Sequence, residues 1–127
     1  MKSKKQKILI VEDDPAVLDA LKWKLGREKF DLITAVNGEE GLAKALAEDP
    51  DLLLLDLILP KMDGITMLKK LRSEIAGKNV KALVLTAATY DKENVELARA
   101  LGVLDYMIKA NWKIKDIVER VKEVLKY

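Results

Sequence analysis

The clearest indication of the fold comes from residues 52–64, which read Leu52-Leu-Leu-Leu-Asp56-Leu-Ile-Leu-Pro60-Lys-Met-Asp63-Gly64. Four consecutive leucines are typical of a short strand that is buried on both faces of a parallel sheet. Asp56 follows this strand directly, at the carboxyl end where open parallel sheets place their ligand sites. The stretch therefore predicts an α/β protein with a carboxylate at the functional edge of its sheet.

A second acidic cluster, Glu12-Asp13-Asp14, follows another apolar run at residues 8–11. If the two strands are neighbours, three or four carboxylates converge at one edge of the sheet, and so much negative charge calls for a bound cation. The chain has no histidine and no cysteine. Oxygen atoms must then hold the cation, which favours magnesium, calcium or manganese over zinc.

Composition narrows the class of protein further. The chain has 127 residues, half of them hydrophobic, which suits one globular domain. Four lysines of the basic segment 1–7 supply its formal charge of +2, and without them 19 basic residues face 21 acidic ones. We therefore expect a solvated tail and no direct contact with nucleic acid. No apolar run approaches the roughly 20 residues of a membrane span, and no signal peptide is recognisable, so we expect a cytoplasmic protein without membrane contact.

Strand and helix patterns alternate along the whole chain. Strands are predicted at residues 8–11, 31–36, 52–55, 82–86 and 104–108, the second of them at an edge because it is less apolar. Helices are predicted after Asp14-Pro15, after Asn37-Gly38, from about residue 65 to 75 and after Asp91. A last helix is predicted to carry Ile114, Ile117, Val118, Val121 and Leu125. Five such units favour a doubly wound parallel sheet with helices on both faces, and right-handed crossovers bring all carboxyl ends of the strands to one edge.

Three further polar side chains fall at or near that edge. Thr86 ends the fourth predicted strand, Lys109 follows the fifth, and Tyr106 lies three residues before Lys109. Each of them is unremarkable alone, since a threonine at the end of a strand and a solvated lysine are both common. Their joint placement beside the two acidic clusters is what points to a functional site.

Together these positions resemble the receiver domain of two-component response regulators, the chemotaxis-protein-Y-like family. The resemblance is carried by four segments: Ile8-Leu-Ile-Val-Glu-Asp-Asp-Pro15, Asp51 to Gly64, Leu83-Val-Leu-Thr-Ala87, and Asp105-Tyr-Met-Ile-Lys109. It implies a flavodoxin-like (βα)5 fold with strand order 2-1-3-4-5, formed by residues 8–127 after a tail at 1–7. The chain ends with its last helix, so we expect a stand-alone receiver without an attached output domain.

The resemblance assigns a role to each acidic residue. Asp56 would be the phosphoacceptor, taking a phosphoryl group from a sensor histidine kinase or a phosphotransfer protein. Asp13 and Asp56 would hold Mg²⁺ directly, the backbone carbonyl of Ile58 would be the third ligand, and Glu12 would act through a water molecule. Magnesium suits such a site because it keeps several waters. A receiver catalyses only its own phosphorylation and dephosphorylation, so we do not expect an enzyme with a separate substrate.

The resemblance also implies a switch. Lys109 would pair with a phosphoryl oxygen, and Thr86 would donate a hydrogen bond to the phosphoryl group. Tyr106 would then move inward from an outward rotamer into the space that Thr86 leaves, altering the face of the fourth helix, fifth strand and fifth helix toward a downstream target protein. The alternative for Tyr106 is a packed ring whose hydroxyl stays in water. Whether phosphorylation also promotes homodimer formation is left open.

Three positions depart from the pattern of the family, in two ways. The family has a cis proline after the lysine, where this chain has Ala110. A cis bond without proline costs about 2.5–4 kcal/mol, so we predict a trans Lys109–Ala110 bond, and its effect on the position of the Lys109 ammonium is left open. Ile58 and Ala88 stand where polar side chains orient the attacking water in other members, which predicts slow loss of the phosphoryl group.

Two alternatives belong to other classes of protein. A pseudo-receiver would share the fold but act only as a protein–protein interaction module, silent in phosphotransfer; Ala110 is the one feature that favours it. An α/β enzyme or cofactor binder would need glycines after its first strand, so that the backbone can approach a pyrophosphate. Residues 12–15 read Glu-Asp-Asp-Pro instead and would repel a bare phosphate.

Overall fold

One parallel five-stranded sheet forms the centre of the computed structural model, which describes residues 5–87 and 91–126. The strands are β1 (Lys7–Val11), β2 (Asp31–Ala35), β3 (Leu52–Leu55), β4 (Lys81–Thr86) and β5 (Asp105–Ile108). Their order is β2-β1-β3-β4-β5. This confirms the predicted fold and places the least apolar strand at an edge. It also makes β1 and β3 neighbours, so the two acidic clusters share one edge of the sheet.

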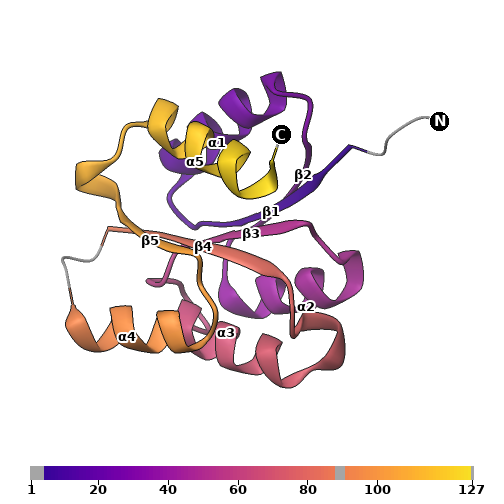
Figure 1. Cartoon of the computed structure of the whole chain (residues 1–127), viewed down its shortest axis with the longest axis vertical. Coiled ribbons are helices and arrows are strands. Elements are labelled where there is room, and N and C mark those ends of the chain that lie inside the picture. The colour runs from indigo at the N-terminus through magenta and orange to yellow at the C-terminus, as the bar shows by residue number, and fades with distance from the viewer. Residues whose placement is uncertain (1–4, 88–90, 127) are drawn as a thin grey trace.

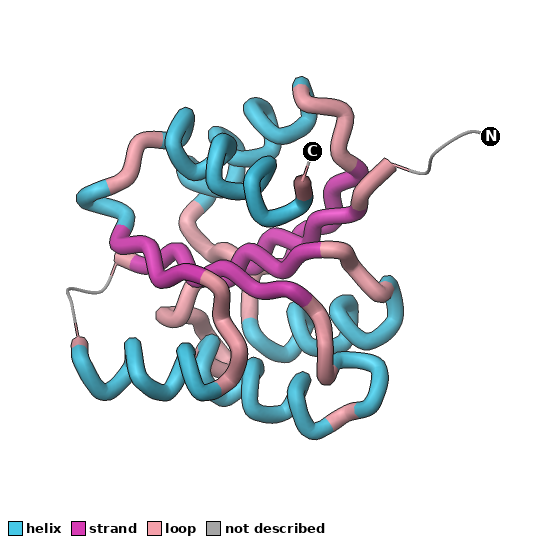
Figure 2. Tube along the Cα trace, viewed as in Figure 1, coloured by secondary structure: helices cyan, strands magenta, loops and turns pink. Residues whose placement is uncertain are grey.

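Helices cover both faces of the sheet. They are α1 (Pro15–Arg27), α2 (Gly38–Glu48), α3 (Gly64–Ser73), α4 (Lys92–Ala100) and α5 (Ile114–Leu125), with short 3₁₀ helices η1 (Ile75–Gly77) and η2 (Lys109–Asn111). Figure 1 shows α1 and α5 on one face and α2, α3 and α4 on the other. The strands lie between these two layers (Figure 2). Within the described ranges no helix combines the length and the apolar character needed to cross a bilayer.

Side-chain caps fix where the helices begin. Asp14 accepts a hydrogen bond from Ala16 N at 3.0 Å, and Pro15 occupies the first position of α1. Asn37 and Asp91 cap α2 and α4 in the same manner. These caps satisfy backbone N–H groups that would otherwise lack a partner, as the sequence predicted.

The core consists of two apolar clusters separated by the sheet. Side chains alternate along β3: Leu53 and Leu55 pack toward α2, α3 and α4, whereas Leu52 and Leu54 pack toward α1 and α5. All four are at most 2% exposed. A strand that is covered on both faces must be apolar at every position, which explains the unbroken leucine run.

The third helix ends earlier than predicted. Residues 65–75 were expected to be helical, but α3 ends at Ser73 and the chain continues as η1. Gly77 packs so closely against Leu71 that a Cβ would not fit, and Arg72 Nη1 donates to Gly77 O at 2.9 Å. This tight return of the chain turns Ile75 outward, where it is 96% exposed.

Candidate functional site

Three carboxylates meet at the carboxyl edge of β1 and β3. Glu12 and Asp56 continue the strand ladder, because Glu12 N donates to Ala35 O and Asp56 N donates to Val11 O, each at 3.0 Å. One carboxylate oxygen from each of Glu12, Asp13 and Asp56 lies within 4.8 Å of the others. Glu12 and Asp56 are only 2% and 4% exposed, whereas Asp13 is exposed. The predicted convergence of acids is therefore present.

A single ammonium group lies between two of these acids. Lys109 Nζ is 2.7 Å from Glu12 Oε1 and 3.3 Å from Asp56 Oδ2. With Ala110 in place of the usual proline, the Lys109 ammonium still reaches the proposed phosphoacceptor. The Lys109–Ala110 peptide bond is trans, as predicted, and no described residue follows a cis bond.

Burial and pairing act against each other in this cluster. Burial raises the pKa of Glu12 above its usual value, although the hydrogen bonds from Lys109 and from the backbone of Asp14 work in the opposite direction. Burial would lower the pKa of Lys109, but its hydrogen bond to Glu12 and the charge of Asp56 outweigh burial and raise it. The ammonium therefore stays charged and offsets part of the repulsion between the carboxylates.

The loop after β3 holds the Asp56 side chain. Ile58 N donates to Asp56 Oδ1 at 3.1 Å, and Gly64 N donates to Leu57 O at 2.9 Å. A Cβ at Gly64 would lie 2.5 Å from the carbonyl oxygen of Asp56, so only glycine fits where α3 begins. Asp63 caps the same helix through Thr66 N at 2.9 Å. These contacts fix the Asp56 backbone between a strand and a helix.

Thr86 and Ile58 lie where the sequence placed them. Thr86 is the last residue of β4 and is fully buried. Ile58 is 58% exposed, two residues beyond Asp56. Ala88, the other position that underlies the expectation of slow phosphoryl loss, lies outside the described residues, so that expectation stays a prediction.

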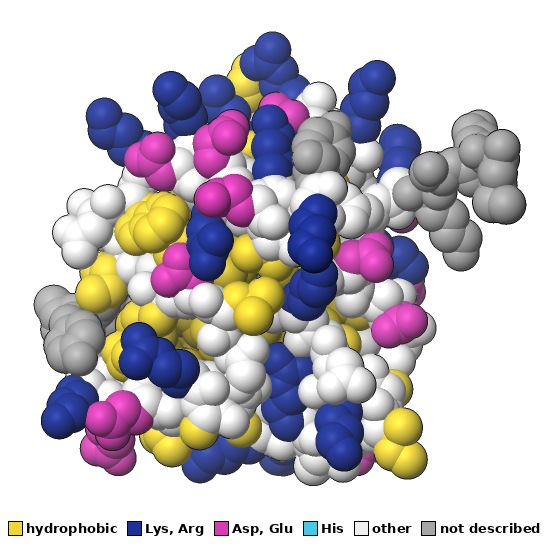
Figure 3. All heavy atoms as spheres, in the orientation of Figure 1, with side chains coloured by type: hydrophobic (Ala, Val, Ile, Leu, Met, Phe, Trp, Pro, Cys, Tyr) yellow, Lys and Arg dark blue, Asp and Glu magenta, His cyan; other side chains and the backbone are white. Residues whose placement is uncertain are grey.

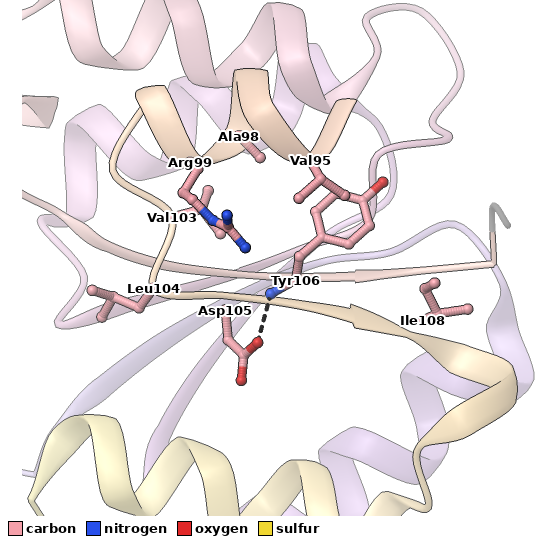
Figure 4. Close-up of a pocket in the computed structure, with 8 residues that line it drawn as sticks. All are labelled: Val95, Ala98, Arg99, Val103, Leu104, Asp105, Tyr106 and Ile108. Carbon is pink, nitrogen blue, oxygen red and sulfur yellow. Dashed lines mark hydrogen bonds between the residues drawn. The ribbon is translucent and has the colours of Figure 1, made fainter. Parts of the chain in front are cut away.

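Tyr106 differs from the expectation. Its hydroxyl is buried and has no hydrogen-bond partner among the described residues, so neither an outward rotamer nor a hydroxyl in water is observed. Figure 4 shows the ring beneath α4, beside Val95, where a hollow of about 190 Å³ separates α4 from β5. The ring packs against the apolar cluster on this face, which explains its inward position. Burial, followed by the charges of Asp91 and Asp56, raises the pKa of Tyr106.

The ion pair between Glu12 and Lys109 was not predicted. From the sequence, we expected Glu12 only to lie near a cation and Lys109 only to pair with a phosphoryl group. The two residues are 97 positions apart, and no local pattern links them. Only the order of the strands, in which β3 and β4 lie between β1 and β5, brings them within reach of each other.

The donor set fits a hard divalent cation. It consists of carboxylate oxygens, one of them exposed to solvent on Asp13, beside the backbone of a loop. Mg²⁺ prefers oxygen ligands and keeps several waters, which an open cluster of this kind allows. Glu12, Asp13 and Asp56 are therefore the described acidic residues that could hold such an ion, either directly or through a water molecule.

This fold and this edge define a receiver domain, and comparison with known proteins agrees. The model of the response regulator receiver domain matches residues 8–122. The chain is 40% identical over 121 residues, 95% of its length, to the alkaline phosphatase synthesis transcriptional regulatory protein PhoP of Bacillus subtilis (strain 168), and covers 49% of that protein. It is 38% identical over 126 residues, 99% of its length, to the DNA-binding response regulator MtrA of Mycolicibacterium smegmatis (strain ATCC 700084 / mc(2)155), and covers 53% of it.

A solved structure gives the same result. The receiver domain protein (CheY-like) from Methanospirillum hungatei JF-1 superposes with a TM-score of 0.88 and 32% identity, over 97% of this chain and 95% of that one. The chain belongs to the response regulator receiver family and is a receiver domain of a two-component system. It spans about half the length of the curated relatives it matches.

Proposed function

We propose that this chain is a phosphorylation switch in which Asp56 accepts a phosphoryl group from a histidine kinase or a phosphotransfer protein. The observation that carries the proposal is the position of Lys109 Nζ, 3.3 Å from Asp56 Oδ2, beside a cluster of three acids. A pseudo-receiver that takes part in no phosphotransfer does not require a buried acceptor carboxylate, an ammonium group and a cluster of acids in the same site. The pseudo-receiver therefore remains the less favoured alternative.

The transfer step uses few protein groups. A carboxylate oxygen of Asp56 attacks the phosphorus, the phosphorus–nitrogen bond of the donor phosphohistidine breaks, and its electron pair leaves with the imidazole. The product is an acyl phosphate on Asp56. Bound Mg²⁺, held by Asp13, Asp56 and the Ile58 carbonyl, would offset the charge of the acids and of the incoming group. Lys109 supplies a second positive charge, and its bond to Glu12 keeps it next to the acceptor.

The output is proposed to pass through β4 and β5. Thr86 of β4 pairs in register with Ile108, and Val84 pairs with Tyr106. A phosphoryl group on Asp56 adds acceptor oxygens that draw the Thr86 hydroxyl toward them. The buried Tyr106 hydroxyl, which has no hydrogen-bond partner in the described ranges, is free to respond, and the ring contacts α4. The face of α4, β5 and α5 would thereby change its affinity for a downstream target protein.

The test is intact mass after incubation with a small phosphoryl donor, with and without Mg²⁺. We expect one phosphoryl addition to the parent chain with Mg²⁺, and none without the metal or in Asp56→Asn. Asp63→Asn is the matched control, because it changes a nearby acid that caps α3 and leaves the acceptor in place. A folded parent chain that binds Mg²⁺ but stays unmodified by both the small donor and a kinase would favour the pseudo-receiver.

A further inference from the structure

The hollow between α4 and β5 has mainly apolar walls and a volume of about 190 Å³. Val95, Ala98 and Val103 line it and are at most 8% exposed. The ring of Tyr106 stands between β5 and α4 as a further wall (Figure 4). Leu104, which also lines the hollow, is 49% exposed. Because an apolar cavity of roughly 150 Å³ can hold benzene, this hollow has room for one six-membered ring.

One cation at the hollow has no acid to pair with. Arg99 lies in the last turn of α4 and is exposed, and its guanidinium reaches from α4 toward β5 (Figure 4). Within the described part of the chain it forms no ion pair with an acid. Figure 3 shows yellow and dark-blue side chains next to one another in the region of α4 and β5, at the lower left of the view. A guanidinium in this position can hold a carboxylate through two parallel hydrogen bonds.

The acid nearest to this cation already has its own partners. Of the described residues that line the hollow, Asp105 is the only acid. Its Oδ2 accepts a hydrogen bond from Arg120 Nε at 2.9 Å, and its Oδ1 accepts one from Tyr106 N at 2.8 Å. Figure 4 shows this carboxylate on the opposite side of β5 from Arg99. The hollow therefore presents an unpaired positive charge beside apolar walls, which favours a ligand that is both anionic and apolar.

We propose that the hollow binds a small carboxylic acid with a single ring. The ring would lie among Val95, Ala98, Val103 and Tyr106, and the carboxylate would pair with Arg99. The apolar walls select a ring, the volume limits it to one, and the unpaired guanidinium selects an anion over an amine or a neutral group. An aromatic ring gains further from an edge-to-face contact with Tyr106. Binding does not require phosphorylation of Asp56, so this site stands apart from the proposed switch.

The test is a titration of the unphosphorylated, ¹⁵N-labelled chain with benzoate, up to about 20 mM, followed by amide chemical shifts. We expect saturable shifts that are largest at residues 95–99 and 103–108, with a Kd on the order of 1 mM, because so small a ligand makes few contacts. Benzyl alcohol keeps the ring without the charge, and acetate keeps the charge without the ring. Each should bind about tenfold or more weakly than benzoate.

Arg99→Gln tests the ionic contact. The change is at an exposed position, so the fold should be kept, and the affinity for benzoate should fall about tenfold while that for benzyl alcohol stays the same. Arg27→Gln is the matched control and should bind benzoate like the parent chain, because this exposed arginine ends α1 on the other face of the sheet (Figure 1).

Three results would each overturn the proposal. They are a parent chain without saturable shifts at the hollow, an affinity for acetate equal to that for benzoate, and an Arg99→Gln variant that binds benzoate as tightly as the parent chain.

Discussion

At the scale of single residues, the site holds charges and polar groups that the fold alone would not favour. Glu12 and Asp56 are buried carboxylates that share one lysine, and Tyr106 buries a hydroxyl that has no hydrogen-bond partner among the described residues. A buried donor without a partner costs about 1–3 kcal/mol. Such groups are retained where two states of a protein use them differently, which agrees with the switch proposed for Tyr106.

Tyr106→Phe removes that hydroxyl and keeps the ring. We expect the unphosphorylated protein to gain about 1 kcal/mol in its free energy of unfolding, because the buried orphan donor disappears while the apolar contacts with α4 remain. Urea denaturation at neutral pH measures the change. The comparison is Tyr106→Leu, which also loses the packing of the ring and should be less stable than the parent chain. A loss of stability in Tyr106→Phe would show that the hydroxyl has a favourable partner.

At the scale of elements, capping side chains decide where the helices around the site begin. Asp63 accepts from Thr66 N at 2.9 Å and from Thr66 Oγ1 at 2.8 Å. The backbone hydrogen bond of Thr66 is the main cause that lowers the pKa of Asp63 below its usual 3.8. The carboxylate form therefore stabilises the N-terminus of α3, which begins directly after the loop that follows Asp56.

Asp63→Ala should lower the free energy of unfolding by about 1 kcal/mol at neutral pH, the usual cost of losing such a cap. A depressed pKa means that the stabilisation is present above the unfolded-state value of 3.8 and is lost as pH falls through the folded-state value. The difference between Asp63→Ala and the parent chain should therefore shrink as pH falls below about 4. Denaturant titrations at several pH values test this. Asp63→Asn, which keeps an accepting oxygen, should show a smaller loss at neutral pH, and a pH-independent gap for Asp63→Ala would contradict the expectation.

At the scale of the whole molecule, two apolar clusters share one sheet. Leu53 faces one cluster and Leu54 the other, and both strand faces are closed by helices. Because every strand contributes to both clusters, neither cluster can unfold while the other stays intact. The receiver should therefore unfold in one cooperative step, as small domains usually do.

Leu53→Ala and Leu54→Ala test this cooperativity. Each should cost about 3 kcal/mol, since both side chains are at most 2% exposed and a cavity remains where the leucine was. Far-ultraviolet circular dichroism follows all elements, whereas tryptophan fluorescence reports on the side of α1 and α5, where Trp112 packs. The two signals should give the same midpoint in both variants. Separate midpoints in either one would show that the two layers unfold independently.

The alternation of strands and helices, the capped helix starts and the candidate residues of the site could all be predicted from the sequence. These features are local: apolar runs, capping residues and turns act within a few positions of the chain, so they are legible without a structure. The end of α3 at Ser73 was not predicted, because it depends on the chain folding back so that Gly77 packs against Leu71. The helix propensities of the individual residues do not reveal this contact.

The positions of the site residues relative to one another could not be predicted from the sequence, because they depend on the tertiary fold. The order of the strands brings Glu12 and Lys109 within 2.7 Å across 97 positions of sequence. Packing beneath α4 turned Tyr106 inward, against the expectation from the family, and the trans bond at Ala110 did not draw Lys109 away from Asp56. Distances, burial and rotamers depend on which elements pack against one another in the folded chain. No pattern along the sequence shows which buried side chain this packing leaves without a hydrogen-bond partner.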